Sequence, residues 1–294
     1  MASTTVIQAG AAPARPAARR PPPERSAALV IPASAFMLFA YAIPLLLLLI
    51  ASVRTPGGIS IMPFVDFLSD PFNWSIIWNT LRIALITTAV ALILGYPMAF
   101  ALNSAKGWVL GLLLISLILP LSVGVVIKAF SWQILLSSNG IVNLTLQALH
   151  ITDGPIRLIF TETGLVLGAV NVFLPFMVLP IYSVIRLIDR DLTSAAACLG
   201  AGPLTQFLRV TLPLSMPGVV VGVAFVFSMS VAMYVIPGLL MGDRFQTLAQ
   251  VIGRSYLLLR NESLGSTVSV ILLLIAVSVV VASDRLVRRL RTVQ

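Results

Sequence analysis

The chain has 294 residues, of which 59% are hydrophobic and only 10% are charged. Soluble domains carry about 25% charged residues, so this composition excludes an ordinary soluble protein. The formal net charge of +9 would also suit a nucleic-acid-binding protein, but no aromatic residues alternate with the arginine clusters and there is no separate basic domain. We therefore expect no nucleic-acid partner and attribute the charge to membrane topology.

The first 26 residues are rich in Ala, Pro and Arg, a composition that cannot bury a core. Segment 1–26 is therefore predicted to be a disordered tail. The apolar run that follows is much longer than the roughly 7–15 residues of a cleavable signal peptide. We expect that run to remain as an anchor, so that residues 27–294 form the membrane domain.

Six charge-free apolar runs follow one another along the chain. Each is about as long as a helix needs to cross some 30 Å of hydrocarbon, and none alternates apolar and polar residues as the strands of a membrane barrel do. The sequence therefore predicts an all-α, polytopic membrane protein. Its six transmembrane helices are expected at 27–53, 83–102, 108–127, 163–185, 214–242 and 264–283.

Six spans put both termini on one side of the membrane, and the basic residues indicate which side. Most of the 19 Lys and Arg residues precede the first span, follow the last, or lie in the loops after the second and fourth spans. Cytoplasmic loops carry such an excess of positive charge. Both termini are therefore predicted to be cytoplasmic.

The spans lack the residues that catalysis or ion coupling would need. Carboxylates are absent from all six, which leaves no paired acids for catalysis and no acid to relay protons. His150 is the only histidine and Cys198 the only cysteine, too few for a metal site or a disulfide. We therefore expect neither an enzyme nor a metal site. An ion-coupled secondary transporter and a helical membrane scaffold or enzyme are alternatives that the residues alone leave open.

The chain also lacks a nucleotide-binding loop. Such a loop needs a lysine followed by Ser or Thr, whereas Lys106 and Lys128 are followed by Gly107 and Ala129. ATP-driven work would therefore require a separate chain. Lys128, at the outer end of the third span, is interpreted as a lysine whose ammonium reaches the membrane interface; contact with substrate is the alternative.

One polar, basic segment interrupts the middle of the chain. Asp191 or Thr193 can cap a helix over 192–199, and Gly200 suits the position that ends it. Pro203 suits the start of a second helix, which is expected to end at Pro213 or at the following Pro-Gly pair. Small alanines beside a projecting Phe207 would suit a groove on a partner protein. A helical hairpin packed on the membrane surface is equally compatible with this pattern.

This segment resembles the EAA motif of permease subunits of binding-protein-dependent ABC importers. The motif has Glu-Ala-Ala, three residues, Gly, nine residues, Ile or Val, one residue, and Leu-Pro. The spacing is complete here, with Ser194 in place of the glutamate. The resemblance implies an ATPase-coupling loop at 187–213, whose key residues are Ser194, Ala195, Ala196, Gly200, Ala201, Phe207, Val210, Leu212 and Pro213.

The resemblance extends over 59–289 and favours the spermidine/putrescine branch of these permeases. Related branches that carry iron, thiamine or phosphonate-type ligands remain alternatives. The segments that carry the similarity are Asn79-Thr80-Leu81, Gly95-Tyr96-Pro97, Ser138-Asn139-Gly140, Glu162-Thr163-Gly164, Leu174-Pro175-Phe176-Met177 and 237–242.

Membership would imply a type I importer permease (MetI-like) fold in a bacterial inner membrane, working by alternating access. The implied partners are an ABC ATPase dimer, a second permease subunit (a copy or, preferably, a sister chain), an extracytoplasmic solute-binding protein and the lipid bilayer. No cofactor is expected on this chain, because ATP would be bound by the ATPase. Serine at 194 removes an ionic contact that the family's glutamate can make with the ATPase.

A polyamine is cationic and would favour carboxylates or aromatic faces along its path. The spans offer no acid, and Lys128 would repel a cation. The candidate path residues are Tyr96, Asn171, Phe173, Tyr182 and Tyr234. Four GxxxG pairs allow close helix contacts and are expected to pack mainly within the subunit: Gly107/Gly111, Gly164/Gly168, Gly218/Gly222 and Gly238/Gly242.

Overall fold

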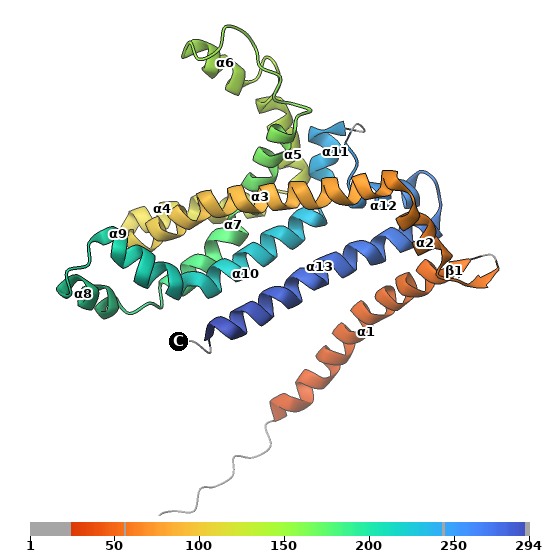
Figure 1. The fold of residues 1–294 in the computed structure, drawn as a ribbon, viewed down its shortest axis with the longest axis horizontal. Coiled ribbons are helices and arrows are strands. Elements are labelled where there is room, and N and C mark those ends of the chain that lie inside the picture. The colour runs from red at the N-terminus through yellow and green to blue at the C-terminus, as the bar shows by residue number, and fades with distance from the viewer. Residues whose placement is uncertain (1–24, 56, 243–244, 292–294) are drawn as a thin grey trace, which may run out of the picture. The chain divides into compact units, whose positions relative to one another are not determined.

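The computed structural model describes residues 25–55, 57–242 and 245–291 (Figure 1). The predicted disordered tail therefore lies outside the described residues, apart from Arg25 and Ser26, which begin helix α1 (Arg25–Val53). The chain divides into two compact units, 1–47 and 48–294. In the first unit the described residues form a single helix, the part of α1 up to Leu47, which contains two prolines.

The second unit is almost entirely helical. Its described residues include a two-stranded antiparallel hairpin, β1 (Arg54–Thr55) and β2 (Gly58–Ile59), in which Arg54 pairs with Ile59. The helices are α2 (Met62–Ser69), α3 (Pro71–Ser104), α4 (Gly107–Ile118), α5 (Val125–Leu135), α6 (Ile141–Ala148), α7 (Glu162–Ile185), α8 (Arg190–Cys198), α9 (Pro203–Gln206), α10 (Leu212–Val231), α11 (Val235–Leu240), α12 (Leu248–Leu257) and α13 (Glu262–Arg291).

The predicted all-α, polytopic architecture is confirmed. Among the described residues, five helices are long and apolar enough to cross a membrane, and a bent pair raises the number to six. Helices α3, α7 and α10 pack against one another, and α13 packs on α10 (Figure 1).

The third predicted span, 108–127, is wrong as a continuous helix. Helix α4 passes into a 3₁₀ turn, Leu119–Ser122, and α5 then leaves at an angle of 105°. The bend follows from the local sequence. Pro120 has no N–H to donate and its ring crowds the preceding turn, and Val123 is extended before Gly124.

The fifth predicted span, 214–242, is also corrected at both ends. The helix that begins at Pro203 continues to Val231, so that Pro213 does not end it, and α11 follows as a separate short helix. A π-helical turn, η2 (Phe207–Thr211), ends two residues before Pro213, and the Leu212 N–H donates to the Phe207 carbonyl five residues back. This wider turn accommodates the proline that would otherwise break the helix.

The core of the second unit is centred on Met177 of α7, which is fully buried. A Cβ atom at Gly95 of α3 would lie 2.9 Å from Met177 Cγ, and one at Gly222 of α10 would lie 2.9 Å from Met177 Sδ. A side chain at either position would therefore require the Met177 side chain or the helices to shift. A Cβ atom at Gly218 would likewise lie 2.8 Å from the Pro180 carbonyl oxygen.

The four GxxxG pairs differ in their surroundings. Gly218/Gly222 and Gly164/Gly168 pack within the subunit, because a Cβ atom at any of the four would come within 3.0 Å of another described residue. At Gly107 and Gly111 a Cβ atom would meet no described heavy atom within 4 Å, so the expectation of internal packing is wrong for that pair. Gly242 meets only the edge of the Phe160 ring, at 3.8 Å, and Gly238 meets nothing within 4 Å.

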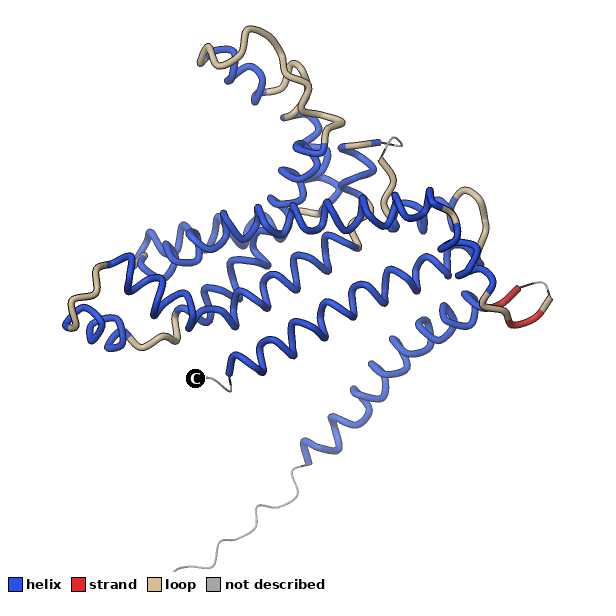
Figure 2. The backbone as a smooth tube through the Cα atoms, in the orientation of Figure 1, coloured by secondary structure: helices blue, strands red, loops and turns tan. Residues whose placement is uncertain are grey.

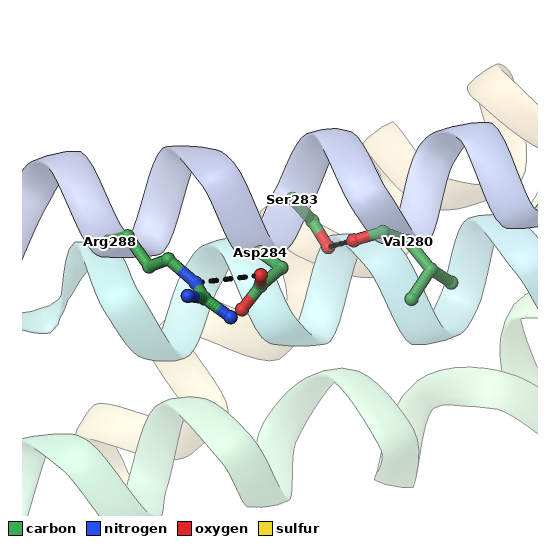
Figure 3. A network of polar contacts seen from close by, with 4 residues as sticks. All are labelled: Val280, Ser283, Asp284 and Arg288. Atoms are coloured by element: carbon green, nitrogen blue, oxygen red, sulfur yellow. Dashed lines mark hydrogen bonds and ion pairs between the residues drawn. The ribbon is translucent and has the colours of Figure 1, made fainter.

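The end of α13 leaves the apolar part of the bundle. Figure 3 shows Arg288 Nε donating to Asp284 Oδ2 at 2.9 Å, four residues apart on the same face, and Ser283 Oγ donating to the Val280 carbonyl. Both charged side chains are well exposed, and an exposed pair of this kind stabilises a helix by only about 0.3–0.5 kcal/mol. It therefore marks a solvated helix end and contributes little to the fold.

Gly218→Ala and Gly111→Ala form a matched pair of variants that tests the close packing of α7 and α10. Alanine gains about 0.5–1 kcal/mol over glycine inside a helix, and at Gly111 nothing opposes that gain. At Gly218 the methyl group meets a backbone oxygen, and overpacking costs about 1–3 kcal/mol. We expect thermal unfolding in detergent to show a lower midpoint for Gly218→Ala and an equal or higher one for Gly111→Ala. Equal midpoints would contradict the close packing.

Candidate functional site

The polar segment predicted as a coupling loop folds into two short helices, α8 and α9, which project from one end of the bundle and are connected by loops (Figure 2). We refer to residues 187–213 as the α8–α9 loop. Helix α8 begins two residues earlier than predicted. Its cap is Asp189, whose Oδ1 accepts a hydrogen bond from the Asp191 N–H at 3.0 Å, so the prediction of Asp191 or Thr193 as the cap is wrong.

Gly200 ends α8, as predicted. Its φ is +81°, a conformation that costs a residue with a Cβ atom about 1–2 kcal/mol. The Gly200 N–H donates to the Ala197 carbonyl at 2.9 Å and the Ala201 N–H donates to the Ala196 carbonyl at 3.0 Å, which is the paired pattern of a Schellman motif. Gln206 Nε2 then donates to the Ala201 carbonyl at 2.7 Å, so α9 is fastened to the same turn.

Five leucines of the loop are exposed, although the sequence analysis singled out none of them. Leu187 is 85% exposed, Leu192 48%, Leu199 88%, Leu204 71% and Leu208 50%. We call Leu199, Leu204 and Leu208, which lie beside the Gly200 turn, in α9 and in η2, the leucine patch. Exposed apolar side chains that form a contiguous surface mark interaction sites. Their signal in the sequence was the presence of leucines in an otherwise polar and basic loop. Of the predicted loop residues, Ser194, Ala195, Gly200 and Pro213 are exposed, and Ala196, Ala201, Val210 and Leu212 are half-buried.

Phe207 does not project outward, and that prediction is wrong. The side chain is half-buried, and its ring packs edge-on against two aromatic rings of α3. The centroid distances are 5.6 Å to Tyr96 and 6.1 Å to Phe100, with interplanar angles of 86° and 89°. The reason is the π turn that begins at Phe207, which changes the angle between successive side chains and turns this one toward the bundle.

The five candidate path residues are distributed along the bundle and do not line one cavity. Tyr96 lies at the end near the α8–α9 loop, where its hydroxyl is 2.8 Å from Ser215 Oγ. Tyr234 follows the far end of α10, about 28 Å away from Ser215 along a helix with 1.5 Å rise per residue. On α7, Asn171 is exposed, Phe173 is buried and Tyr182 is half-buried.

Tyr234 lines a cleft of about 610 Å³ between α5, α11 and α12. The Tyr234 ring packs on Gly253, where a Cβ atom would lie only 2.5 Å from the ring. The cleft walls are mainly apolar, with Gln246, Gln250 and Arg254 as its polar side chains. Sequence reasoning found only Tyr234, because the bend before α5 that creates this cleft was not predicted.

Several polar contacts fix the end of the bundle that carries this cleft. The Leu248 N–H at the start of α12 donates to Thr80 Oγ1 of α3 at 2.9 Å. The Phe160 N–H donates to the Leu240 carbonyl at 2.9 Å, and Arg82 of α3 forms an ion pair with Glu162 of α7. Segments far apart in the sequence are thereby tied together at this end.

Lys128 is only 7% exposed, so most of its side chain is covered, and its interpretation as a lysine whose ammonium reaches the interface stays a prediction. The bend before α5 turns the face that carries Lys128, Ala129 and Leu136 toward the bundle. In the described ranges, no three side chains of His, Cys, Asp or Glu gather in a way that could hold a metal ion.

Comparison with known proteins identifies the family. The sequence model of the family described as "Binding-protein-dependent transport system inner membrane component" matches residues 91–292. The spermidine/putrescine transport system permease protein PotB of Haemophilus influenzae is 33% identical over 263 residues, covering 86% of this chain and 92% of that protein. The PotB protein of Escherichia coli is 35% identical over 208 residues, covering 71% of this chain and 76% of that protein.

A solved structure shares the fold. It is the crystal structure of a bacterial ABC transporter involved in the import of the acidic polysaccharide alginate, with a TM-score of 0.72 and 19% identity, covering 90% of this chain and 95% of the matched one. The six-span, all-α architecture is thus the type I (MetI-like) importer permease fold. The chain belongs to the binding-protein-dependent transport system inner membrane component family and is a permease subunit of an ABC importer.

Proposed function

We propose that this chain forms half of the translocation pathway of an ATP-driven importer for spermidine, putrescine or a similar polyamine. The observation that carries the substrate class is the identity of 33–35% to two spermidine/putrescine permeases over most of the chain. Iron, thiamine or phosphonate-type ligands on the same architecture are the second candidate. A secondary transporter is disfavoured by the family.

In this proposal the α8–α9 loop docks on a separate ATPase subunit that binds and hydrolyses ATP. The support is a loop with a fixed turn at Gly200 and an outward leucine patch, at one end of the membrane helices. Because Ser194 cannot form the ionic contact that the family's glutamate can, apolar burial of the leucine patch would supply the contact with the ATPase.

The remaining partners follow from the same architecture. A second permease subunit, in our proposal a sister chain, would complete the pathway, and an extracytoplasmic binding protein would deliver the ligand to the end near Tyr234. We propose that both termini are cytoplasmic. In support, the C-terminal end of α13, with Arg285, Arg288 and Arg289, lies at the same end of the bundle as α8 and α9 (Figure 1).

We propose that the candidate path residues contact the substrate. Asn171 is an exposed amide on a membrane helix, a position where a polar group is costly in lipid and is best explained by a pathway or a partner subunit. Tyr234 offers an aromatic face to a cation, and Tyr182 and Phe173 would follow along α7. The Tyr96 hydroxyl already forms a hydrogen bond with Ser215, and its ring packs on Phe207 within the subunit.

The first experiment is affinity purification of the tagged chain in mild detergent, with mass spectrometry of the associated proteins. We expect an ATPase chain and a second six-span permease in stoichiometric amounts, and a solute-binding protein whose bound ligand identifies the substrate. A chain that is reproducibly free of any nucleotide-binding partner in several detergents would contradict the importer assignment.

Leu204→Asp and Leu258→Asp test the docking surface as a matched pair. Both leucines are equally accessible, 71% and 74% exposed, but Leu204 belongs to the leucine patch and Leu258 borders the cleft at the other end. We expect Leu204→Asp to lose most of the co-purifying ATPase, since a charge buried at an interface without a partner costs several kcal/mol. Leu258→Asp should keep it. Equal retention of ATPase by both variants would rule out the leucine patch as the docking surface.

Gly200→Asp tests the turn itself. The substitution strains a backbone with φ of +81° and adds a charge to the loop, so we expect ligand uptake to be abolished while membrane insertion is unchanged. Gly202→Asp adds the same charge two residues later, where φ is −67°, and should keep measurable uptake. Normal transport by Gly200→Asp would contradict a coupling role for the loop.

A further inference from the structure

The junction between the α8–α9 loop and α10 has an unusual construction. It is the π-helical turn η2, in which the Leu212 N–H donates to the Phe207 carbonyl. Short π-helical turns inside α-helices occur frequently at functional sites and are places where helices bend. Because α9, η2 and α10 otherwise form one helix from Pro203 to Val231, this turn is where a pull on the loop would be absorbed by bending.

Contacts with α3 brace this turn. The Phe207 ring meets Tyr96 and Phe100 edge-on at centroid distances of 5.6 and 6.1 Å. Tyr96 and Phe100 are four residues apart and therefore lie on the same face of α3. Edge-to-face aromatic pairs have a preferred geometry, so Phe207 is held in orientation as well as in position.

Hydrogen bonds also connect Tyr96 to Ser215 and Ser215 to Leu212. Ser215 Oγ is fully buried and donates to the Leu212 carbonyl at 2.9 Å. The same oxygen lies 2.8 Å from the Tyr96 hydroxyl, a hydrogen bond in which either hydroxyl can donate. The Tyr96 hydroxyl thus contacts Ser215, which follows the π turn, and the Tyr96 ring contacts Phe207, the first residue of the turn.

Tyr96 also connects the turn to the centre of the bundle. The residue before it, Gly95, is the position at which α3 meets Met177 of α7. Tyr96 thus contacts Phe207 directly and adjoins the point where α3 packs on Met177.

We propose that Tyr96, Phe100, Phe207, Leu212 and Ser215, which we call the α3 joint, transmit the movement of the α8–α9 loop to α3 by preventing the π turn from bending. Tyr96 and Phe207 are positioning residues in this role. The inference rests on the proposed function, because it concerns how an ATP-driven movement of the loop reaches the membrane helices.

The test uses the assembled transporter, with its ATPase, sister permease and binding protein, reconstituted in liposomes. Uptake of putrescine and hydrolysis of ATP are measured on the same preparation. Tyr96→Phe removes only the hydroxyl and Phe207→Leu removes only the ring. We expect each variant to keep ATP hydrolysis while the amount of putrescine moved per ATP falls about five- to tenfold, the lower part of the usual range of coupling between sites.

Tyr256→Phe is the matched control. It deletes a similar tyrosine–serine hydrogen bond, 2.7 Å to Ser266, remote from the loop, and the ratio of transport to hydrolysis should stay at the wild-type value. Combining Tyr96→Phe with Ser215→Ala should reduce the ratio no further than the more damaging single variant, since both remove one contact. A merely structural role would instead lower transport and hydrolysis together, and that result would overturn the proposal.

A distance measurement tests the joint without depending on the ligand. Spin labels on Ser104 at the end of α3 and Thr205 on α9, both exposed, are introduced in a Cys198→Ser background. In the wild type we expect the same distance between the labels before and after trapping of the ATPase with ATP and vanadate.

In Phe207→Leu the mean distance should shift, or the distribution of distances should broaden, on trapping. A wild-type shift as large as that of the variant would overturn the proposal. If the binding protein does not stimulate ATP hydrolysis by the wild-type complex, the proposed function itself is refuted.

Discussion

The contact of Met177 with two glycines is the interaction on which the rest of the bundle depends. Within a membrane the surrounding lipid is as apolar as the side chains, so helices associate by close packing and small residues. Gly95 on α3 and Gly222 on α10 leave room for the Met177 side chain, and an added Cβ atom at either would come within 2.9 Å of it. The positions of α3 and α10 relative to α7 are therefore set at a single level of the bundle.

Further contacts on either side of this level fix the two ends of the bundle. Toward the α8–α9 loop, Gly218 rests on the Pro180 carbonyl, and Tyr96 contacts Ser215 and Phe207. Toward the other end, Gly168 meets Leu240 of α11, and Thr80 of α3 accepts the hydrogen bond that fixes the start of α12. The helix from Pro203 to Val231 runs from the α8–α9 loop past Met177 to the opposite end, so it is the element that connects the loop with the far end of the bundle.

The features that could be predicted from sequence are those that depend on nearby residues or on composition. Gly200 was predicted to end α8 because a positive φ is a property of one residue, and the apolar runs gave the spans because length and hydropathy suffice. The bend before α5 was missed because the run 108–127 is apolar throughout, and hydropathy is insensitive to Pro120 and Gly124. The direction of Phe207 was missed because a π turn breaks the helical period from which it was inferred. The cleft beside Tyr234 could not be predicted, because it exists only as a result of that bend.

In the proposed docking, the leucine patch offers a substitute for the glutamate that the family has at the position of Ser194. Phe207 packs on α3, while the leucine patch is exposed. Fully burying a leucine side chain contributes about 1.5–3 kcal/mol, whereas an exposed ion pair contributes about 0–1 kcal/mol. Burial of even one residue of the leucine patch on a partner would thus exceed what the missing carboxylate could supply in a solvated contact. The proposed docking also needs a loop of fixed shape, which the turn at Gly200 and the Gln206–Ala201 hydrogen bond support.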